Sequence, residues 1–467
     1  MLFTSSIFIV LLLTTFILYY IPLLRKYQIG ILIIASLLFY SYNNLPMVIL
    51  LLFSVAVNIV SSYYIVYGKL KHQKLNAVAG VTINLLVLSF FKYAGLLALT
   101  FGNSENKLEM FLISLPLPIG ISFFTFQGIS LIIDVYRGKY MDRKKLVPQS
   151  FTKHAWQILF FKGFFPQLIS GPIVKAHEFI PQIEPKYINQ IDFEKVFKNL
   201  VLGYFLKMVI ADNLKDFTFY ISFPYFQTQA SITLIFLLIG FSFQIFSDFA
   251  GYSLIAIGFA KLFGYHFNDN FNFPYIASSF KDFWKRWHIS LSTFLMEYLY
   301  FPLGGNRKGK LRMYLNLLIV MALGGLWHGA AWSYMIWGGV HGLALVIERM
   351  VDSNHPAPEK ITNKIIRNGI VFIFVTLAWL LFKLPEFDHV IQYFCSIKAN
   401  CHTEINYKLI TYIILYSIPV VLYHAVYLYK IKGGKISDRI QIFSYASMLF
   451  LILVNSGSTG AFIYFQF

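Results

Sequence analysis

Charged side chains are scarce in this sequence. They make up 13% of the 467 residues, about half the share usual in a soluble globular domain. Hydrophobic residues make up 57%, and apolar runs long enough to cross a bilayer recur throughout the chain. The composition argues against a soluble domain and predicts an all-α, polytopic integral membrane protein with about 11–12 transmembrane helices.

Several catalytic and metal-binding signatures are also missing. The sequence has no serine-hydrolase elbow, no P-loop and no HExxH motif, so any catalysis must rest on histidines and other polar side chains. Its two cysteines, Cys395 and Cys401, lack the paired C-x-x-C spacing of a metal site. The first apolar run lacks a basic leader and a cleavage site, which predicts a retained helix. Without repeats or long linkers, a single membrane-embedded domain is expected over residues 1–467.

The segments expected to cross the membrane are apolar and of suitable length. They are Leu2–Leu24, Ile29–Tyr42, Pro46–Tyr67, Asn76–Phe101, Leu117–Tyr136, Phe193–Ile210, Ser231–Phe263, Tyr314–Met335, Ile336–Met350, Ile366–Leu384, Leu409–Tyr429 and Ile440–Ile463. A further apolar segment, Ala155–Pro172, is short and carries Lys162 and Pro166. We interpret it as a re-entrant segment, which is tolerated where protein covers its backbone.

The distribution of positive charge predicts the orientation. Basic residues follow the first, third and fifth expected spans, whereas the alternate loops are nearly neutral. The positive-inside rule then places the N-terminus outside, together with the segment Pro385–Lys408 and both cysteines. On that side of the membrane the sequence allows either a Cys395–Cys401 disulfide or two free thiols. The formal charge of +18 is assigned to cytoplasmic loops and anionic lipid, and no nucleic-acid partner is expected.

A strongly amphipathic segment covers Phe280–Tyr298. Its apolar residues recur at steps of three and four, which predicts one interfacial helix with its apolar face inward. His288 falls at the rim of that face, where it either lines a polar tunnel or bonds to a backbone carbonyl. Past this segment, Arg307 and Lys308 follow a turn signal. Together with Arg286 they are candidates to bind a phosphate-bearing donor such as coenzyme A, although positive-inside bias explains the cluster equally well.

One histidine, His328, lies inside an apolar run among glycines. Ionisable groups at membrane depth are costly and usually face a cavity or a partner, and a neutral imidazole is basic enough to take a proton from a hydroxyl. His341 follows thirteen residues later and falls off the His328 face unless the helix breaks at Trp337–Gly339; a helix–helix hydrogen bond is its favoured role. Asp248 is a candidate to line a tunnel because a purely structural role is harder to find for it.

At this point the chain resembles the membrane-bound O-acyltransferase family, and within it the alginate and peptidoglycan O-acetyltransferase branch. The motifs that carry the resemblance are Pro166–Ile173, Ser247–Ser253, Asn270–Tyr275, Phe283–Ser292, Tyr298–Asn306, Gly325–Gly329 and Phe462–Phe467. The resemblance is strongest over residues 117–343. Two departures are Leu254, where many relatives have aspartate, and Met296-Glu297, where many have Arg-Asp.

The resemblance implies a ring of helices around a central tunnel. His328 matches the family's catalytic histidine and His288 its second, tunnel-lining histidine. Asp248, Tyr252, Trp287 and Trp327 fall within matched motifs and are expected to line or support the tunnel, as is His341. No metal and no bound cofactor are expected. Acetyl-CoA is the expected donor on the cytoplasmic side of a bacterial inner membrane, and a periplasmic serine-hydrolase-like O-acetyltransferase is the expected partner.

The acceptor is expected to be peptidoglycan, because this polymer is nearly universal among bacteria. The alternatives are alginate, another exported polysaccharide, or D-alanylation of teichoic acid. Two rivals belong to other classes of protein. A proton-coupled transporter often shows pseudo-symmetric halves, which are not visible here, and a non-catalytic scaffold would not depend on His328.

Overall fold

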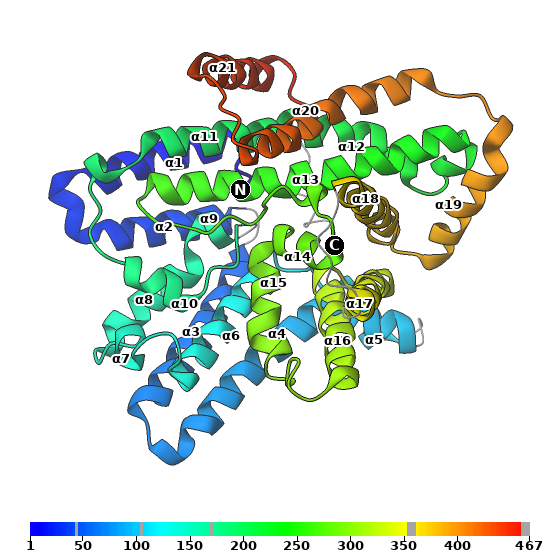
Figure 1. The fold of residues 1–467 in the computed structure, drawn as a ribbon. Helices are drawn as coiled ribbons and strands as arrows, with labels where there is room; N and C mark the ends of the chain where they lie inside the picture. The colour runs from blue at the N-terminus through cyan, green and yellow to red at the C-terminus, as the bar shows by residue number, and fades with distance from the viewer. Residues whose placement is uncertain (43–44, 103–105, 169–170, 353–360, 459–467) are drawn as a thin grey trace. The chain divides into compact units, whose positions relative to one another are not determined.

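A computed structural model describes residues 1–42, 45–102, 106–168, 171–352 and 361–458, and every regular element in these ranges is helical (Figure 1). The chain forms two compact units. Unit 1 comprises Met1–Asn199 and Ile255–Asn268, and unit 2 comprises Leu200–Leu254 and Asp269–Phe467. The expected single domain and its central tunnel stay predictions.

Unit 1 is a bundle in which α3 contacts α4, α6 and α8. Polar side chains line this contact: the amide of Asn58 donates to Asn84 Oδ1 at 3.2 Å, and Lys162 Nζ donates to Ser54 Oγ at 2.6 Å. In an apolar setting such bonds hold helices together. The helices of this unit are α1 (Ser6–Tyr20), α2 (Gln28–Ser41), α3 (Leu45–Tyr67), α4 (Gln73–Phe101), α5 (Lys107–Ser114), α6 (Ile121–Arg137), α7 (Arg143–Leu146), α8 (Phe151–Gly163), α9 (Phe165–Leu168) and α10 (Ala176–Phe179).

The segment expected to be re-entrant, Ala155–Pro172, forms the end of α8 and the short α9. Its positions 169–170 lie outside the described residues. Lys162, on the last turn of α8, is fully buried. Residues 160–168 are all buried, so this part of the segment is covered by protein, as a re-entrant segment requires, while Trp156 is exposed and the depth of the segment in a membrane stays a prediction.

Unit 2 contains the C-terminal half of the chain together with most of α13. Two of its elements, η5 and η9, are π-helical turns, a form often found at functional sites. Its elements, with α11 and α13 shared with unit 1, are α11 (Phe193–Tyr204), η5 (Phe205–Ala211), α12 (Asp212–Thr218), α13 (Ser231–Leu262), α14 (Phe280–Arg286), α15 (Ile289–Leu295), η9 (Met296–Tyr300), α16 (Lys310–His328), α17 (Trp332–Asp352), α18 (Ile361–Lys383), α19 (Phe387–Ala399), α20 (Tyr407–Ile431) and α21 (Asp438–Val454).

Seven helices among the described residues are long and apolar enough to cross a membrane. They are Pro22–Ser41, Leu45–Tyr67, Leu70–Phe101, Ser231–Leu262, Lys310–His328, Asn363–Lys383 and Tyr407–Ile431. The other expected spans also form helices (α1, α6, α11, α17 and α21), but these are shorter or more polar. The all-α, multi-pass prediction is confirmed, whereas the N-terminus-outside orientation and any further spans stay predictions.

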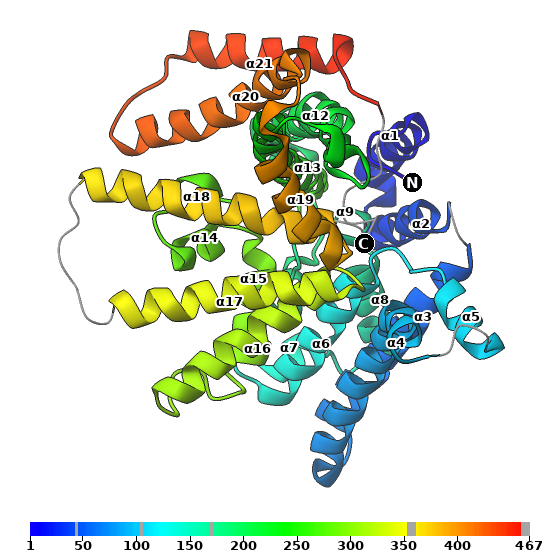
Figure 2. The same ribbon diagram turned by 90° about the vertical axis from the view of Figure 1, so that its right-hand side faces the viewer.

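The boundary expected between two spans at Met335 and Ile336 is wrong. The structure ends α16 at His328 and begins α17 at Trp332, and α17 runs unbroken through Trp337–Gly339. Figures 1 and 2 show the two helices side by side. Their contact depends on glycine: a Cβ on Gly325 would lie 2.1 Å from Tyr334 O, and one on Gly338 would lie 2.1 Å from Met321 O.

The segment with the two cysteines is more regular than expected. Cys395 lies on α19, and Cys401 lies in the short helical turn that follows it. Both are exposed free thiols in this structure.

Candidate functional site

The predicted helix over Phe280–Tyr298 is broken at His288. The helix α14 ends at Arg286, and α15 begins at Ile289. His288 between them has φ 43° and ψ 55°, the left-handed conformation, which costs a non-glycine residue about 1–3 kcal/mol. As a result its side chain is fully buried and does not lie at the rim of an apolar face.

His288 and His328 lie together in unit 2. Their ring centroids are 5.9 Å apart, and the ring of Trp327 lies 5.7 Å from that of His288. His328 is the last residue of α16 and is 3% exposed. His288 lies outside the seven candidate spans, and burial lowers the pKa of its imidazole to about 3, so the ring is neutral at physiological pH.

Aromatic rings surround the two histidines. The ring of Trp337 lies 5.3 Å from that of His328, and the ring of Phe249, on α13, lies 4.5 Å from that of His288. Trp287 stacks on Phe283 at 5.7 Å. This shell excludes water and lowers the local dielectric, which strengthens hydrogen bonds made to a bound group.

His341 approaches the site from α17, but not as expected. Its ring lies 4.9 Å from Trp337 and 5.2 Å from Trp284. Neither ring nitrogen has a hydrogen-bond partner among the described residues, so the favoured helix–helix hydrogen bond is not formed. His341 supports the aromatic shell behind His328, since Trp337 contacts both histidines.

A cavity of about 450 Å³ opens beside His328. Its lining follows α16 from Leu317 to His328, a length of roughly 17 Å at 1.5 Å per residue. Most of the lining is apolar. The lining residues are Lys281, Trp284, Lys285, Ile289, Leu291, Ser292, Thr293, Leu295, Met296, Tyr300, Leu317, Val320, Met321, Gly324, Gly325, His328, Trp337, Leu345, Glu348 and Arg349.

Three cations, Lys281, Lys285 and Arg349, line this cavity. Glu348 supplies the carboxylate of the lining, and this carboxylate binds backbone groups of α14. It accepts hydrogen bonds from the backbone N–H groups of Phe280 and Lys281, and so fixes the start of α14 against α17. The three cations and Glu348 thus lie at the side of the cavity formed by α14 and the end of α17.

The three cations expected to bind the donor do not line this cavity. Arg286 pairs with Asp282 at 2.9 Å and donates to the carbonyl of Asn272. Arg307 and Lys308 are exposed in the turn between η9 and α16. The sequence does contain a signal for the observed set, because Lys281 and Lys285 lie one turn apart on a predicted helix.

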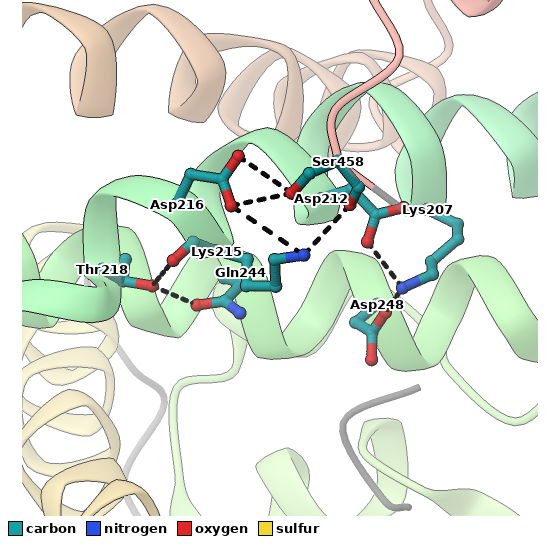
Figure 3. Close-up of polar contacts among 8 residues, drawn as sticks. All are labelled: Lys207, Asp212, Lys215, Asp216, Thr218, Gln244, Asp248 and Ser458. Atoms are coloured by element: carbon teal, nitrogen blue, oxygen red, sulfur yellow. Dashed lines mark hydrogen bonds and ion pairs between the residues drawn. The ribbon is translucent and has the colours of Figure 1, made fainter. Parts of the chain in front are cut away.

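Asp248 and Tyr252 belong to a second cluster, around Lys207. Figure 3 shows Asp248 and Asp212 on either side of the lysine. Lys207 Nζ lies 2.7 Å from Asp212 Oδ1 and 2.6 Å from Asp248 Oδ1, and all three side chains are nearly inaccessible. The Tyr252 ring lies 5.4 Å from the same nitrogen. Lys207 was not singled out from the sequence, although a lysine inside an apolar run indicates function or a buried partner.

The cluster forms because α13 and η5 approach closely. A Cβ on Gly251 would lie 2.8 Å from the carbonyl oxygen of Gly203 and 2.9 Å from the backbone nitrogen of Lys207, so only glycine permits this contact. The segment Asn455–Ser458 returns to the same place. Gly457 N donates to Met208 O at 2.9 Å, and Lys215 Nζ donates to Ser458 O at 3.0 Å (Figure 3).

The fold and the site together define an all-α, multi-pass membrane protein with two buried histidines, one of which, His328, lines a mostly apolar cavity. The sequence matches the profile of the MBOAT, membrane-bound O-acyltransferase family over residues 3–385, and the chain belongs to this family. It is a membrane-bound acyltransferase.

Relatives of known name include a peptidoglycan O-acetyltransferase of Helicobacter pylori, which is 34% identical over 83% of this chain and 80% of the relative. A probable alginate O-acetylase of Azotobacter vinelandii is 36% identical over 83% of this chain and 76% of the relative. A teichoic acid D-alanyltransferase of Bacillus subtilis is 27% identical over 58% of this chain and 70% of the relative.

Proposed function

We propose that this protein transfers an acetyl group from a cytoplasmic thioester, acetyl-CoA, for O-acetylation of peptidoglycan. The observation that carries the proposal is the pairing of His288 with His328, at a ring distance of 5.9 Å, beside a cavity with cations in its lining. Family membership and the activities named for the relatives support acyl transfer to a cell-wall polymer.

The cavity suits a thioester on a long, flexible arm. Its apolar length accommodates the arm, and Lys281, Lys285 and Arg349 would pair with phosphates at the far end of the donor. Met296, which stands where many relatives have arginine, lies in the lining. In this chain, the positive charges that would bind the donor phosphates therefore come from α14 and α17.

The two histidines divide the chemistry. His328 takes the proton from the attacking hydroxyl as a general base; the thioester C–S bond then breaks, and the proton leaves with the coenzyme A thiol. Alternatively, His328 carries the acyl group transiently after the same thiol has left. His288, neutral and fully buried, orients the thioester and donates a hydrogen bond to the carbonyl oxygen as negative charge develops there. The thioester supplies the driving force. Asp248 and Tyr252 act at a distance, through the packing of α13.

The proposed function also requires a location, an orientation and a partner for the protein. We place the protein in the bacterial inner membrane with its N-terminus outside, in contact with lipid along its exposed apolar helices. A periplasmic serine-hydrolase-like O-acetyltransferase would complete the transfer to glycan. Peptidoglycan is preferred over alginate because it is nearly universal in bacteria. Identities of 34% and 36% do not separate the two acceptors.

The test is the O-acetyl content of isolated peptidoglycan, measured by mass spectrometry in a deletion strain. The strain is complemented with wild type, with His328→Ala, or with His402→Ala as a control at an exposed histidine, at matched membrane levels. Restoration by wild type and His402→Ala, but not by His328→Ala, is expected. Acetylation unchanged by the deletion would remove peptidoglycan as the acceptor. Restoration by His328→Ala would favour a scaffold.

A further inference from the structure

The break that carries His288 is held by a segment outside both of its helices. Asn270 accepts a hydrogen bond from Ile289 N at 2.9 Å through its backbone carbonyl, and Asn272 N donates to Arg286 O at 2.9 Å. These two bonds lie on either side of Trp287 and His288. The chain therefore cannot continue as one helix without losing both.

The side chain of Asn270 makes three more bonds. Its Oδ1 accepts from Ser290 N at 3.1 Å and from Ser290 Oγ at 2.9 Å, and its Nδ2 donates to Ser253 Oγ at 3.2 Å. Asn270 is 1% exposed. Ser253 belongs to α13 and Ser290 to α15, so this one amide joins the start of α15 to α13.

These bonds replace an ordinary helix cap. The first N–H groups of a helix lack partners within it, and the N-cap side chain usually accepts from one of them. The N-cap of α15 is His288, whose side chain makes no such bond and whose backbone is left-handed. Asn270 supplies the missing acceptor from another part of the chain, and the imidazole of His288 lies with its ring centroid 5.9 Å from that of His328.

We propose that Asn270 is the positioning residue for His288: it caps α15 from outside the helix and thereby holds the left-handed turn that directs the imidazole towards His328. The catalytic consequence rests on the proposed function, whereas the effect on the His288 side chain does not. Asn270 itself touches no reacting atom.

The kinetic test uses purified, reconstituted protein and measures acetyl transfer from acetyl-CoA. A misplacement of a catalytic group by about 1 Å can cost ~100-fold in rate, so Asn270→Ala should lower kcat by roughly ten- to a hundredfold with little change in the KM for acetyl-CoA. Asn270→Asp keeps an oxygen that accepts both bonds from Ser290, and Ser253 can donate to its other oxygen, so it should retain more of kcat than Asn270→Ala despite the cost of a buried carboxylate. Asn272→Ala is the matched control, because Asn272 is exposed and binds Arg286 through its backbone alone.

A second readout does not depend on activity. Diethylpyrocarbonate modifies accessible imidazoles, and both His288 and His341 are fully buried. In Asn270→Ala, modification of His288, followed by peptide mass spectrometry, should rise several-fold while His341 stays protected. Equal exposure of both histidines, or unchanged protection of His288, would overturn the proposal.

The two experiments together separate the positioning role from the proposed function. If wild-type protein transfers no acetyl group, the proposed function fails and the modification of His288 still decides the role of Asn270. If His328→Ala is inactive and Asn270→Ala keeps wild-type kcat, only the positioning role fails.

Discussion

Phe249 packs edge-on against His288, with their ring centroids 4.5 Å apart. The preceding residue on α13, Asp248, pairs with Lys207 at 2.6 Å. Successive residues of a helix point about 100° apart, so α13 presents one side chain to the histidine pair and its neighbour to the charged cluster. The histidine pair and the Lys207 cluster therefore share one helix.

Replacing Phe249 tests that packing. Phe249→Ala removes a fully buried ring and should lower the free energy of unfolding by about 3–5 kcal/mol. It should also reduce kcat, because His288 loses its neighbour. Thermal unfolding in detergent and acetyl transfer are the measurements. Phe301→Ala is the control, since Phe301 is 52% exposed; equal effects of the two variants would contradict the prediction.

The Lys207 cluster should behave as a charge-balanced unit. Lys207→Met leaves Asp212 and Asp248 buried without their cation and should destabilise the protein by about 3–5 kcal/mol. Adding Asp212→Asn and Asp248→Asn to the same chain removes the uncompensated charges and should restore most of the unfolding temperature. A triple variant no more stable than Lys207→Met would show that charge is not the cause.

The cations of the cavity should govern donor affinity. Replacing Lys281, Lys285 or Arg349 by glutamine should raise the KM for acetyl-CoA about three- to tenfold each, because a charge-assisted contact with phosphate is lost, and should leave kcat nearly unchanged. Arg307→Gln and Lys308→Gln are matched controls outside the cavity lining. A short acetyl thioester without phosphate should not distinguish any of these variants from wild type.

The contact between α16 and α17 should tolerate no Cβ at its glycines. Gly325→Ala and Gly338→Ala would each place a methyl group 2.1 Å from a backbone oxygen, and should destabilise the protein by at least about 1–3 kcal/mol. Gly339→Ala meets no atom within 4 Å and should be neutral or slightly stabilising. Thermal unfolding of the three variants compares them, and a stable Gly338→Ala protein would refute the close approach.

The sequence predicts much of the fold because membrane helices depend on local hydrophobicity. The long apolar runs became α3, α4, α13 and α20 with boundaries shifted by a few residues. His328 could be found in the same way, as an ionisable residue inside such a run. These are properties of neighbouring residues, and no knowledge of the tertiary structure is needed to see them.

The parts that could not be predicted depend on residues far apart in the chain. The break at His288 is invisible in the amphipathic pattern, because Asn270 and Ser253 hold it from outside the helix. The cations that line the cavity could not be identified from the sequence for a related reason. The sequence shows where lysines and arginines occur along the chain. Which of them face the cavity depends on the contact between α14 and α17 that Glu348 makes.

The bond between Met208 and Gly457 has a consequence for biosynthesis. Nearly all of unit 2 lies between these two residues, so the ribosome makes η5 and its buried lysine long before the segment that closes over them. During that interval the charges of Lys207 and Asp212 must be accommodated by the insertion machinery, by water or by lipid headgroups. The contact that closes unit 2 at η5 can therefore form only after Gly457 has been made, and a premature stop far downstream of both histidines would remove it.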